Sequence, residues 1–344
     1  MNTLRIVGIG GGTGLPVLLT GLAGRLGINL SGIVTVADNG GSSGRLREGF
    51  AMPAVGDLRN CMVALSDRDS TLADLFQHRF PAGGCLEGHA LGNLIVAALY
   101  QKTGSLVQAI ELASRMLRLQ GRAMAATEAS VTLCATLRDG RIARGESQIT
   151  GAAGAIERIW LEPERPPPSQ GVLDAIRAAD ALVLAPGSLY TSLLPNLLVD
   201  GVADAIRQST AVKILVCNLT TQPGETDGYT ASDHLRAVAQ YLGSGLIQFC
   251  VVNSPLPRSV SQRLAHHSQL VSYDPQRIAA LGAIPVLARL LAPAASGKIR
   301  HCPDKLGRLV AKIARSWTGS LARPDRSTDS IRRYPVRTLQ SVAA

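Results

Sequence analysis

Four segments of the sequence combine glycine with serine, threonine or acidic side chains directly after short apolar runs. They are 8–14 (GIGGGTG), 37–44 (ADNGGSSG), 185–192 (APGSLYTS) and 217–230 (CNLTTQPGETDGYT). Glycines let backbone N–H groups approach an anion closely, and a helix that starts after them adds a favourable dipole. Serine and threonine hydroxyls donate to phosphate oxygens or to sugar hydroxyls. Together the four segments indicate a site for a ligand that contains phosphate and sugar.

The candidate ligand contacts lie in and beside these segments. Asp38 and Asn39 stand where they could orient a sugar hydroxyl or share a Mg²⁺ ion, with Asp38 as the candidate metal ligand. Asn60, His89 and Asn93 lie near predicted helix starts, and for His89 and Asn93 a capping and packing role is an equally good interpretation. The residues themselves predict the following ligand-binding set: Gly10, Gly11, Gly12, Thr13, Gly14, Asp38, Asn39, Ser42, Ser43, Arg45, Asn60, His89, Asn93, Gly187, Ser188, Tyr190, Thr191, Asn218, Thr221 and Glu225.

The glycine segment at 8–14 fails two common nucleotide-binding motifs. A P-loop requires a lysine after its last glycine, and none follows here. The dinucleotide pattern G-x-G-x-x-G ends on Thr13 when it is counted from Gly8, and on Leu15 when it is counted from Gly10. Asp38 nevertheless stands at the end of the predicted second strand, where an acid binds the ribose of NAD. An NAD-dependent oxidoreductase therefore stays an open alternative.

No group of residues predicts a catalytic centre. Ser188 lies in PGSLY and not in the G-x-S-x-G of a nucleophile elbow. Cys217 is interpreted as a buried strand residue, and Asp57 as a helix cap. The histidines lack the spacing of zinc ligands. The catalytic residues are therefore left unassigned.

The four segments need a scaffold that brings them to one edge. Alternating strands and helices predict a Rossmann-like, doubly wound, mostly parallel α/β sheet with helices on both faces, and ligands bind at the carboxyl ends of such strands. Residues 1–318 are expected to form one domain, with 162–171 (EPERPPPSQG) as the best internal boundary and 319–344 as a basic, disordered tail. Periodicity predicts strands at 4–9, 33–37, 181–184, 213–216 and 246–252, a hairpin at 131–145, and helices at 16–26, 58–65, 71–76, 91–100, 106–117, 172–178, 196–208 and 232–242.

Composition narrows the class of protein. The chain has 344 residues, of which 46% are hydrophobic and only 3% aromatic, a mixture suited to helices packed on a parallel sheet. The net charge is +10, but the basic residues are not interleaved with aromatic residues. We therefore favour small anions over nucleic acid as ligands. The six cysteines form no C-x-x-C pair, as is typical of a reducing cytosol. We expect a soluble cytoplasmic protein with no membrane span and no nucleic-acid partner.

Seven segments, taken in order, carry a specific family resemblance. They read IGGGTGLPVLL, TVADNGGSSGRLR, GDLRNCMVALS, LFQHRF, GHALGNL, PGSLYTSLLPNLLV and CNLTTQPGETDGYTASDHL. Together they resemble the bacterial gluconeogenesis factor family, which is related to 2-phospho-L-lactate transferase. The resemblance runs from about residue 4 to residue 316 and does not include the tail.

The resemblance implies a Rossmann-like cytosolic protein that binds nucleotide-activated sugars such as UDP-N-acetylglucosamine or UDP-glucose. It implies a role in growth on gluconeogenic carbon sources and in the regulation of cell shape. It adds two candidate ligand contacts, Tyr273 against the uracil and Arg300 in Arg-His-Cys, where the family usually has Arg-His-Asp. The usual Asp-Asp-Gly-Gly reads Asp-Asn-Gly-Gly here, and Asn39 brings no charge to a Mg²⁺ ion.

Three functions are compatible with these observations. The leading hypothesis is a UDP-sugar-binding regulatory protein, expected to form a homo-oligomer and to act with a protein partner in cell-envelope or carbon regulation. The second is a Mg²⁺-dependent transferase of the 2-phospho-L-lactate transferase type that acts on a nucleotide-linked donor. The third is the NAD-dependent oxidoreductase.

Overall fold

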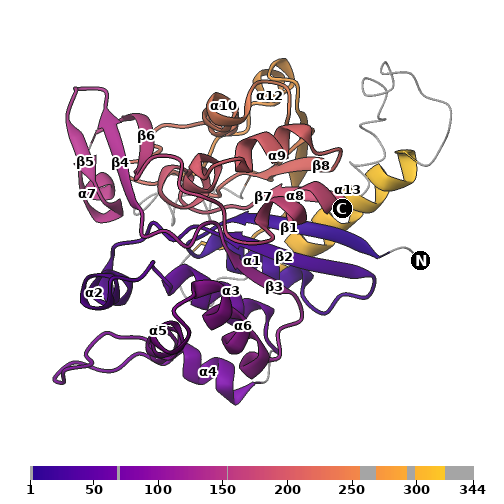
Figure 1. The fold of residues 1–344 in the computed structure, drawn as a ribbon. Coiled ribbons are helices and arrows are strands. Elements are labelled where there is room, and N and C mark those ends of the chain that lie inside the picture. Colours follow the sequence, from indigo (N-terminus) through magenta and orange to yellow (C-terminus); the bar gives the residue numbers. More distant parts are fainter. Residues whose placement is uncertain (1–2, 68–69, 153, 256–268, 293–298, 322–344) are drawn as a thin grey trace.

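A wholly parallel sheet forms the centre of the molecule (Figure 1). The structure is a computed structural model that describes residues 3–67, 70–152, 154–255, 269–292 and 299–321. Within these residues the sheet has seven strands. In spatial order they are β10 (Ile284–Ala288), β9 (Phe249–Asn253), β8 (Val212–Val216), β7 (Ala181–Leu184), β1 (Leu4–Gly10), β2 (Ile28–Val34) and β3 (Arg122–Ala125).

The strand order reverses between β1 and β7. From β1 the chain builds the sheet in one direction to β2 and β3, and from β7 it builds in the other direction to β8, β9 and β10. In a doubly wound sheet the loops that leave the carboxyl ends of the two central strands diverge at this reversal and form a crevice. The predicted doubly wound parallel sheet is confirmed, and the four glycine-rich segments follow four neighbouring strands, β8, β7, β1 and β2.

A small antiparallel sheet stands beside the main one, on the side away from the N-terminus (Figure 1). The hairpin predicted at 131–145 is confirmed, because Leu137 donates its N–H to the carbonyl of Arg141 and Gly140 turns with a φ of +86°. The helix α7 (Glu146–Gly151) follows the hairpin. The strands, in spatial order, are β5 (Ile142–Arg144), β4 (Thr132–Leu137) and β6 (Ile156–Glu162).

Helices cover both faces of the main sheet. On one face α3 (Gly56–Leu65) and α13 (Pro303–Leu321) pack on α1 (Gly14–Leu22). In a second group of helices, α9 (Val202–Gln208) packs against both α8 (Val172–Ala178) and α10 (Ala231–Leu242). The connection from β2 to β3 contains α2 (Gly41–Phe50), α3, α4 (Thr71–Gln77), α5 (Leu91–Thr103) and α6 (Leu106–Leu117), while α12 (Pro275–Ala280) precedes β10.

Leucine spacing explains why α1 forms and which side it buries. Leu15, Leu18, Leu19 and Leu22 recur at the helical period, and all four are 0% exposed. The adjacent strand β1 is buried at every position except Arg5. The first strand, the glycine turn and α1 therefore form one tightly packed unit.

Several predicted boundaries are wrong. The second strand is Ile28–Val34 and not 33–37, because its pairing with β1 starts at Ile28. The segment from Gly41 onward is the helix α2 and not a loop. The helix predicted at 196–208 is interrupted by Gly201, whose φ is +73°, so α9 begins only at Val202. The elements β3, β6, β10, α7, α12 and α13 were not predicted, since they are short or lie outside the clearest periodic runs.

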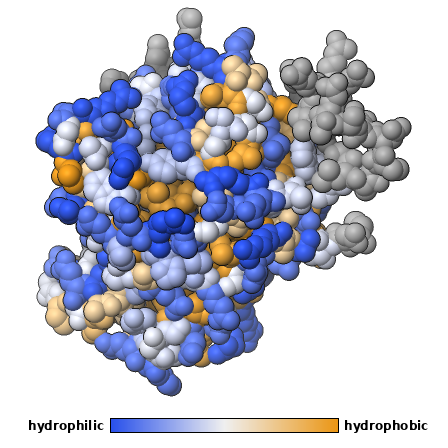
Figure 2. All heavy atoms as spheres, turned by 45° about the horizontal axis from the view of Figure 1, so that its top comes forward, coloured by the Kyte–Doolittle hydropathy of each residue, from blue (hydrophilic) through white to orange (hydrophobic). Residues whose placement is uncertain are grey.

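The predicted tail begins inside a helix. Residues 319–321 belong to α13, so the prediction of disorder is wrong for them, and 322–344 lie outside the described residues. On the face in Figure 2, hydrophilic residues are mixed with smaller apolar patches. Within the described residues no helix is long and apolar enough to cross a membrane.

Two glycines bring α13 against α1. A Cβ atom at Gly307 would stand 2.1 Å from the carbonyl oxygen of Gly21, and one at Gly21 would stand 2.0 Å from the carbonyl oxygen of Pro303. Backbone therefore meets backbone at this crossing. The crossing fixes the segment before α13 relative to the glycine turn that opens α1.

Gly307→Ala should destabilise the protein by about 1–3 kcal/mol, because the added methyl group must push the two helices apart. Gly319→Ala is the matched control, since Gly319 lies in the same helix with nothing within 4 Å of its Cβ position. The control should be neutral or stabilising by up to about 1 kcal/mol. Urea unfolding of both variants tests this, and a Gly307→Ala protein as stable as the control would contradict the close crossing.

Candidate functional site

A cavity of about 310 Å³ opens at the strand-order reversal. Its walls come from the loops after β1, β7 and β8, together with α7 and the segment before α13. Below it is called the switch-point cavity. It is lined by Gly12, Thr13, Gly14, Val17, Glu146, Pro186, Gly187, Ser188, Ser192, Asn218, Leu219, Thr220, Gln222, Ile299, Arg300 and His301.

The glycine turn after β1 is held in place by a carboxylate. Gly12 has a φ of +58°, and its N–H donates to Oδ2 of Asp57 at 2.6 Å. Gly14 lies so close to the next loop that a Cβ atom there would stand 1.8 Å from the carbonyl oxygen of Pro186. The first N–H groups of α1, which have no partner inside the helix, therefore open beside the cavity.

Two buried or half-buried asparagines fasten the loops around the reversal. The Asn218 side chain accepts the N–H of Gly187 at 2.8 Å and donates to the carbonyl of the same residue at 2.7 Å. Asn196 is 0% exposed and donates to the carbonyl of Gly10 at 3.1 Å. The ends of β1, β7 and β8 are thus tied together by side-chain amides.

A π-helical turn at Leu189–Leu193 brings Thr191 between two acids. The Thr191 hydroxyl lies 3.1 Å from Oε1 of Glu225 and 3.3 Å from Oε1 of Glu146. Glu225 also accepts the N–H of Tyr190 at 3.3 Å. Because one hydroxyl donates a single proton, it can serve only one of the two carboxylates at a time. Turns of this kind are frequent at functional sites.

The acids near the cavity hold protons more tightly than usual. Burial, followed by the nearby charges of Asp38 and Asp57, raises the pKa of Glu146 to about 8. Burial also raises the pKa of Asp57 to about 6, against the opposing effect of the Gly12 N–H, and it raises the pKa of Glu225. At neutral pH Glu146 is therefore mostly protonated, and a bound cation would favour its ionised form.

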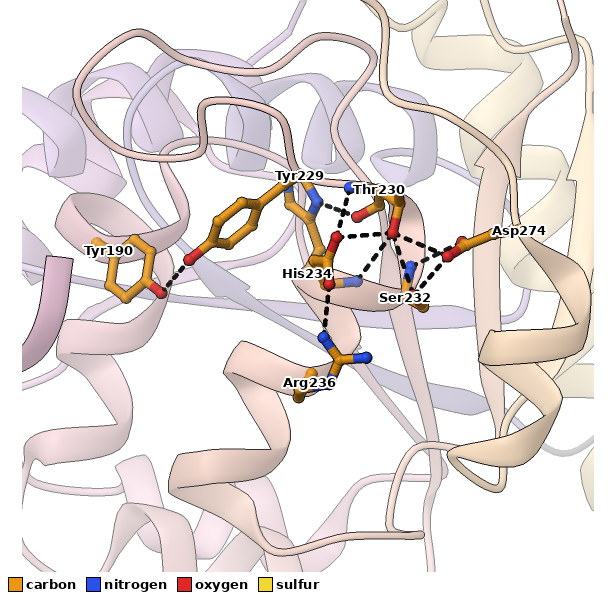
Figure 3. Close-up of polar contacts among 8 residues, drawn as sticks. Tyr190, Tyr229, Thr230, Ser232, His234, Arg236 and Asp274 are labelled. Atoms are coloured by element: carbon orange, nitrogen blue, oxygen red, sulfur yellow. Dashed lines mark hydrogen bonds and ion pairs between the residues drawn. The ribbon is translucent and has the colours of Figure 1, made fainter. Parts of the chain in front are cut away.

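A polar network holds the loop that follows β8 (Figure 3). The Tyr229 and Tyr190 hydroxyls lie 2.8 Å apart. Thr230 caps α10 and donates its hydroxyl to Asp274 at 2.8 Å, and Asp274 also accepts the N–H of Ser232 at 3.0 Å. The network joins α10 to the start of α12 and fixes where the loop leaves the cavity wall.

Seven residues of the sequence-predicted set line the switch-point cavity. The structure brings them together from the loops after β1, β7 and β8 and from the segment before α13. Gly10 and Gly11 lie directly behind the wall, where Gly11 packs so closely that a Cβ atom would stand 2.6 Å from Oδ2 of Asp57. The seven are Gly12, Thr13, Gly14, Gly187, Ser188, Asn218 and Arg300.

Three other predicted contacts form a separate buried network. The Ser42 hydroxyl lies 3.1 Å from Nδ1 of His89 and accepts from Nδ2 of Asn93 at 3.0 Å. The three residues join the first turn of α2 to the start of α5. Ser43 is buried beside Gly56, where its Oγ stands 2.3 Å from the Cβ position of that glycine. The packing interpretation is therefore the better one for His89 and Asn93.

Asn39 and Arg45 are not among the residues that line the switch-point cavity, and their contact with a ligand stays a prediction. The Asn39 amide oxygen accepts the N–H of Ser147 at 3.1 Å, so it faces the start of α7. Arg45 is exposed and donates to the carbonyl of Glu87 at 2.5 Å. The segment at 37–44 was treated as a loop, but Arg45 belongs to the helix α2 that begins at Gly41, while Asn39 lies in the segment before that helix.

The remaining predicted contacts are also absent from the lining of the cavity. Asn60 accepts from Arg59 at 2.5 Å, and Thr221 donates to the carbonyl of Gln269 at 3.3 Å. Tyr273 is half-buried against the core and is absent from the lining. For Asp38, Oδ1 accepts the N–H of Gly40 at 2.7 Å while Oδ2 lies 3.3 Å from the Cβ position of Gly56, next to Asp57.

Sequence reasoning left out two ionisable lining residues, Glu146 and His301, and also Asp57, which contacts the glycine turn without lining the cavity. Glu146 follows a hairpin strand, and no glycine-rich pattern marks it. Asp57 was interpreted only as a helix cap, although it holds the glycine turn. His301 is 6% exposed, and burial lowers its pKa to about 4, so its ring is a neutral wall at physiological pH. Only its place after Arg300 in the family resemblance could have identified it.

One protein family and several individual proteins are similar in sequence to most of this chain. Residues 6–291 match the family described as 2-phospho-L-lactate transferase CofD. The chain is 46% identical over 284 residues to the gluconeogenesis factor of Halalkalibacterium halodurans, a match that covers 82% of this chain and 88% of that protein. It is 42% identical over 311 residues to the gluconeogenesis factor of Bacillus subtilis, covering 90% and 98%.

A solved structure is also similar along most of the chain. The crystal structure of a UPF0052 family protein from Bacillus halodurans superposes with a TM-score of 0.86 at 42% identity. The match covers 90% of this chain and 100% of that one. The similarity therefore extends over most of the chain.

The raised pKa of Glu146 predicts a pH-dependent stability. An acid whose pKa is higher in the folded state stabilises the fold at low pH, and this contribution is lost as the pH rises through about 8. Between about pH 5 and pH 9, the free energy of unfolding of Glu146→Gln should therefore fall less than that of the wild type, by up to about 4 kcal/mol. Glu157→Gln, which removes an exposed acid on β6, is the control. Identical pH profiles for all three proteins would contradict the assignment.

Proposed function

The chain belongs to the 2-phospho-L-lactate transferase CofD family, among the members named gluconeogenesis factors, and from that membership we propose that it binds a nucleotide-linked sugar in the switch-point cavity. The proposed ligand is a UDP-sugar such as UDP-N-acetylglucosamine or UDP-glucose. Binding would make the protein a sensor of that sugar in growth on gluconeogenic carbon sources and in the regulation of cell shape.

One observation carries the proposal: a glycine turn and a helix start open onto a cavity with a single permanent cation. Arg300 is the only lysine or arginine among the described lining residues. The other basic residue there, His301, is neutral because its pKa is lowered to about 4. A diphosphate could take hydrogen bonds from the backbone N–H groups of Thr13 and Gly14 and an ion pair from Arg300, whereas the N–H of Gly12 already donates to Asp57. This combination suits a diphosphate better than a triphosphate, which needs more positive charge.

The rest of the cavity wall suits a ligand with hydroxyl groups. Ser188, Asn218 and Gln222 lie together on one side, with the Gln222 amide donating to the Ser188 hydroxyl at 2.6 Å. Such amides and hydroxyls both donate and accept, as sugar hydroxyls do. Val17 and Leu219 supply apolar surface. A volume of about 310 Å³ lies at the lower end of the range for ligand pockets.

Titration calorimetry of the purified protein tests the ligand class. UDP-N-acetylglucosamine should bind, whereas NAD and GDP should bind at least about tenfold more weakly. Gly12→Val should abolish binding, because its side chain would meet Oγ of Ser192 at 3.1 Å and project where the phosphates lie. Gly27→Val is the matched control: Gly27 also has a positive φ, +70°, but nothing lies within 4 Å of its Cβ position.

Two results would contradict the proposed mode of UDP-sugar binding. A folded Gly12→Val protein with wild-type affinity would show that the glycine turn does not hold the ligand. Tight NAD binding with no response to UDP-sugars would instead favour the oxidoreductase.

A second candidate function is a Mg²⁺-dependent transferase of the family's named type. It is favoured by the acids near the cavity, of which Asp38 and Asp57 are the candidate metal ligands. Asp38 and Asp57 flank Gly56, and the pKa of Asp57 is raised partly by the charge of Asp38. Mg²⁺ commonly binds one or two carboxylates and completes its shell with phosphates and water. No group of three His, Cys, Asp or Glu side chains that could hold a metal occurs among the described residues, so the two acids fit an ion completed by the ligand. Such an ion would offset the diphosphate charge.

The structure changes the expectation for Asn39. Because its oxygen already accepts from Ser147, Asn39→Asp should leave the Mg²⁺ dependence of UDP-sugar binding unchanged. Asp38→Asn should reduce the enhancement by Mg²⁺ by about tenfold, since it removes half of the carboxylate pair. Calorimetry with Mg²⁺ and with a chelator compares the variants. Stronger Mg²⁺ dependence in Asn39→Asp would mean that residue 39 can reach the metal.

A further inference from the structure

A second hollow, of about 550 Å³, lies between α13 and the loop after α1. We call it the basic hollow. Because Arg25 and Leu26 precede β2, and Gly27 accepts the N–H of Leu4 at the start of β1, it lies at the amino ends of the central strands. The switch-point cavity lies at their carboxyl ends. The basic hollow is lined by Arg25, Leu26, Arg308, Ala311, Lys312, Arg315 and Ser316.

One face of α13 carries a row of cations. The helix buries Leu306 and Val310, while Arg308, Lys312 and Arg315 are exposed at successive turns. Like charges four positions apart on a helix repel one another. Repulsion of this kind is relieved when a negatively charged surface approaches the row.

No acid of the described residues neutralises this row. Arg308 and Arg315 donate to backbone carbonyls, at 3.2 Å and 3.4 Å, and form no ion pair with a described residue. Asp304 pairs with Arg25 at 3.6 Å and does not line the hollow. The chain beyond α13 adds positive charge, since 322–344 contains five arginines and two aspartates.

A large apolar side chain stands at the edge of the hollow. Leu26 is 93% exposed, more than any other large hydrophobic residue that the structure describes. A single exposed leucine is ordinary, but here it protrudes among four cations. Basic side chains around a protruding apolar residue are typical of surfaces that lie on anionic membranes, where both the charge and the apolar group find partners.

We propose that this end of the molecule docks on the surface of an anionic phospholipid membrane. Arg25, Arg308, Lys312 and Arg315 face headgroup phosphates, and Leu26 enters the boundary between headgroups and acyl chains. The contact is peripheral and does not involve a membrane span. The switch-point cavity, at the other end of the strands, stays open to its ligand while the protein is docked.

The loss of membrane binding expected from each substitution can be stated as a fold-change. Each basic residue near an anionic surface strengthens binding by roughly fivefold, so removing three should weaken it by about 100-fold. The contribution of Leu26 is apolar, and Leu26→Ser should weaken binding by about tenfold. Added salt should weaken binding of the wild type, because the charges act through solvent.

Vesicle sedimentation of the full chain tests the proposal. The wild type should sediment with vesicles that contain phosphatidylglycerol and not with pure phosphatidylcholine vesicles. Arg308→Ala combined with Lys312→Ala and Arg315→Ala should lose this binding. Lys102→Ala combined with Arg138→Ala and Arg277→Ala removes the same charge from exposed positions elsewhere and should keep it. Melting temperatures and UDP-N-acetylglucosamine calorimetry check that every variant is folded.

Several outcomes overturn the proposal. They are wild-type protein that stays in solution with anionic vesicles, equal sedimentation of the wild type and the α13 triple variant, and unchanged binding by Leu26→Ser. Binding of double-stranded DNA or soluble polyphosphate in preference to anionic vesicles also overturns it, because the hollow would then serve another polyanion.

Discussion

The absence of a side chain at Gly14 is the constraint on which the site depends. The start of α1 can lie against the loop after β7 only because no Cβ atom stands between it and the carbonyl oxygen of Pro186. This contact places the first turn of a helix at the point where the strand order reverses. Asn218 and Asn196 then fasten the neighbouring loops, and Asp57 fastens the glycine turn. The cavity wall is made mostly of backbone held at close range.

One acid, Glu146, lines a cavity whose backbone favours an anion, and the charges of Asp38 and Asp57 act on it. The carboxyls of Asp57 and Glu146 are buried close to each other and to Asp38, so their pKa values rise. A proton, a cation or a change in ligand charge each relieves the same repulsion. The ligand binding proposed for this site would therefore be linked to pH and to cation concentration. Because the ring of His301 is neutral, Arg300 is the one permanent positive charge among the described residues of the wall.

The sheet and much of the cavity were predictable from local pattern. Apolar runs separated by helical periods give a doubly wound sheet, and the ends of such strands point to Gly12, Gly187 and Asn218. The family resemblance, read from seven ordered segments, is confirmed by the matched family and relatives. What failed depended on contacts distant in sequence. Glu146 comes from outside the main sheet, and the helical conformation of α2 turns Arg45 outward, so neither placement follows from local pattern.

The packing of α13 on α1 has a consequence for how the molecule is made. The switch-point cavity joins Gly12 and Gly14 to Arg300 and His301, which are synthesised long after the glycine turn. The leucine-rich α1 emerges from the ribosome early, but the surface around Gly21 must wait for Gly307 before it is covered. Folding that proceeds from the N-terminus can thus build β1, α1 and β2 first. The cavity itself is completed only after residue 301 has been synthesised, so a chain interrupted before that point would carry the glycine turn without a complete cavity.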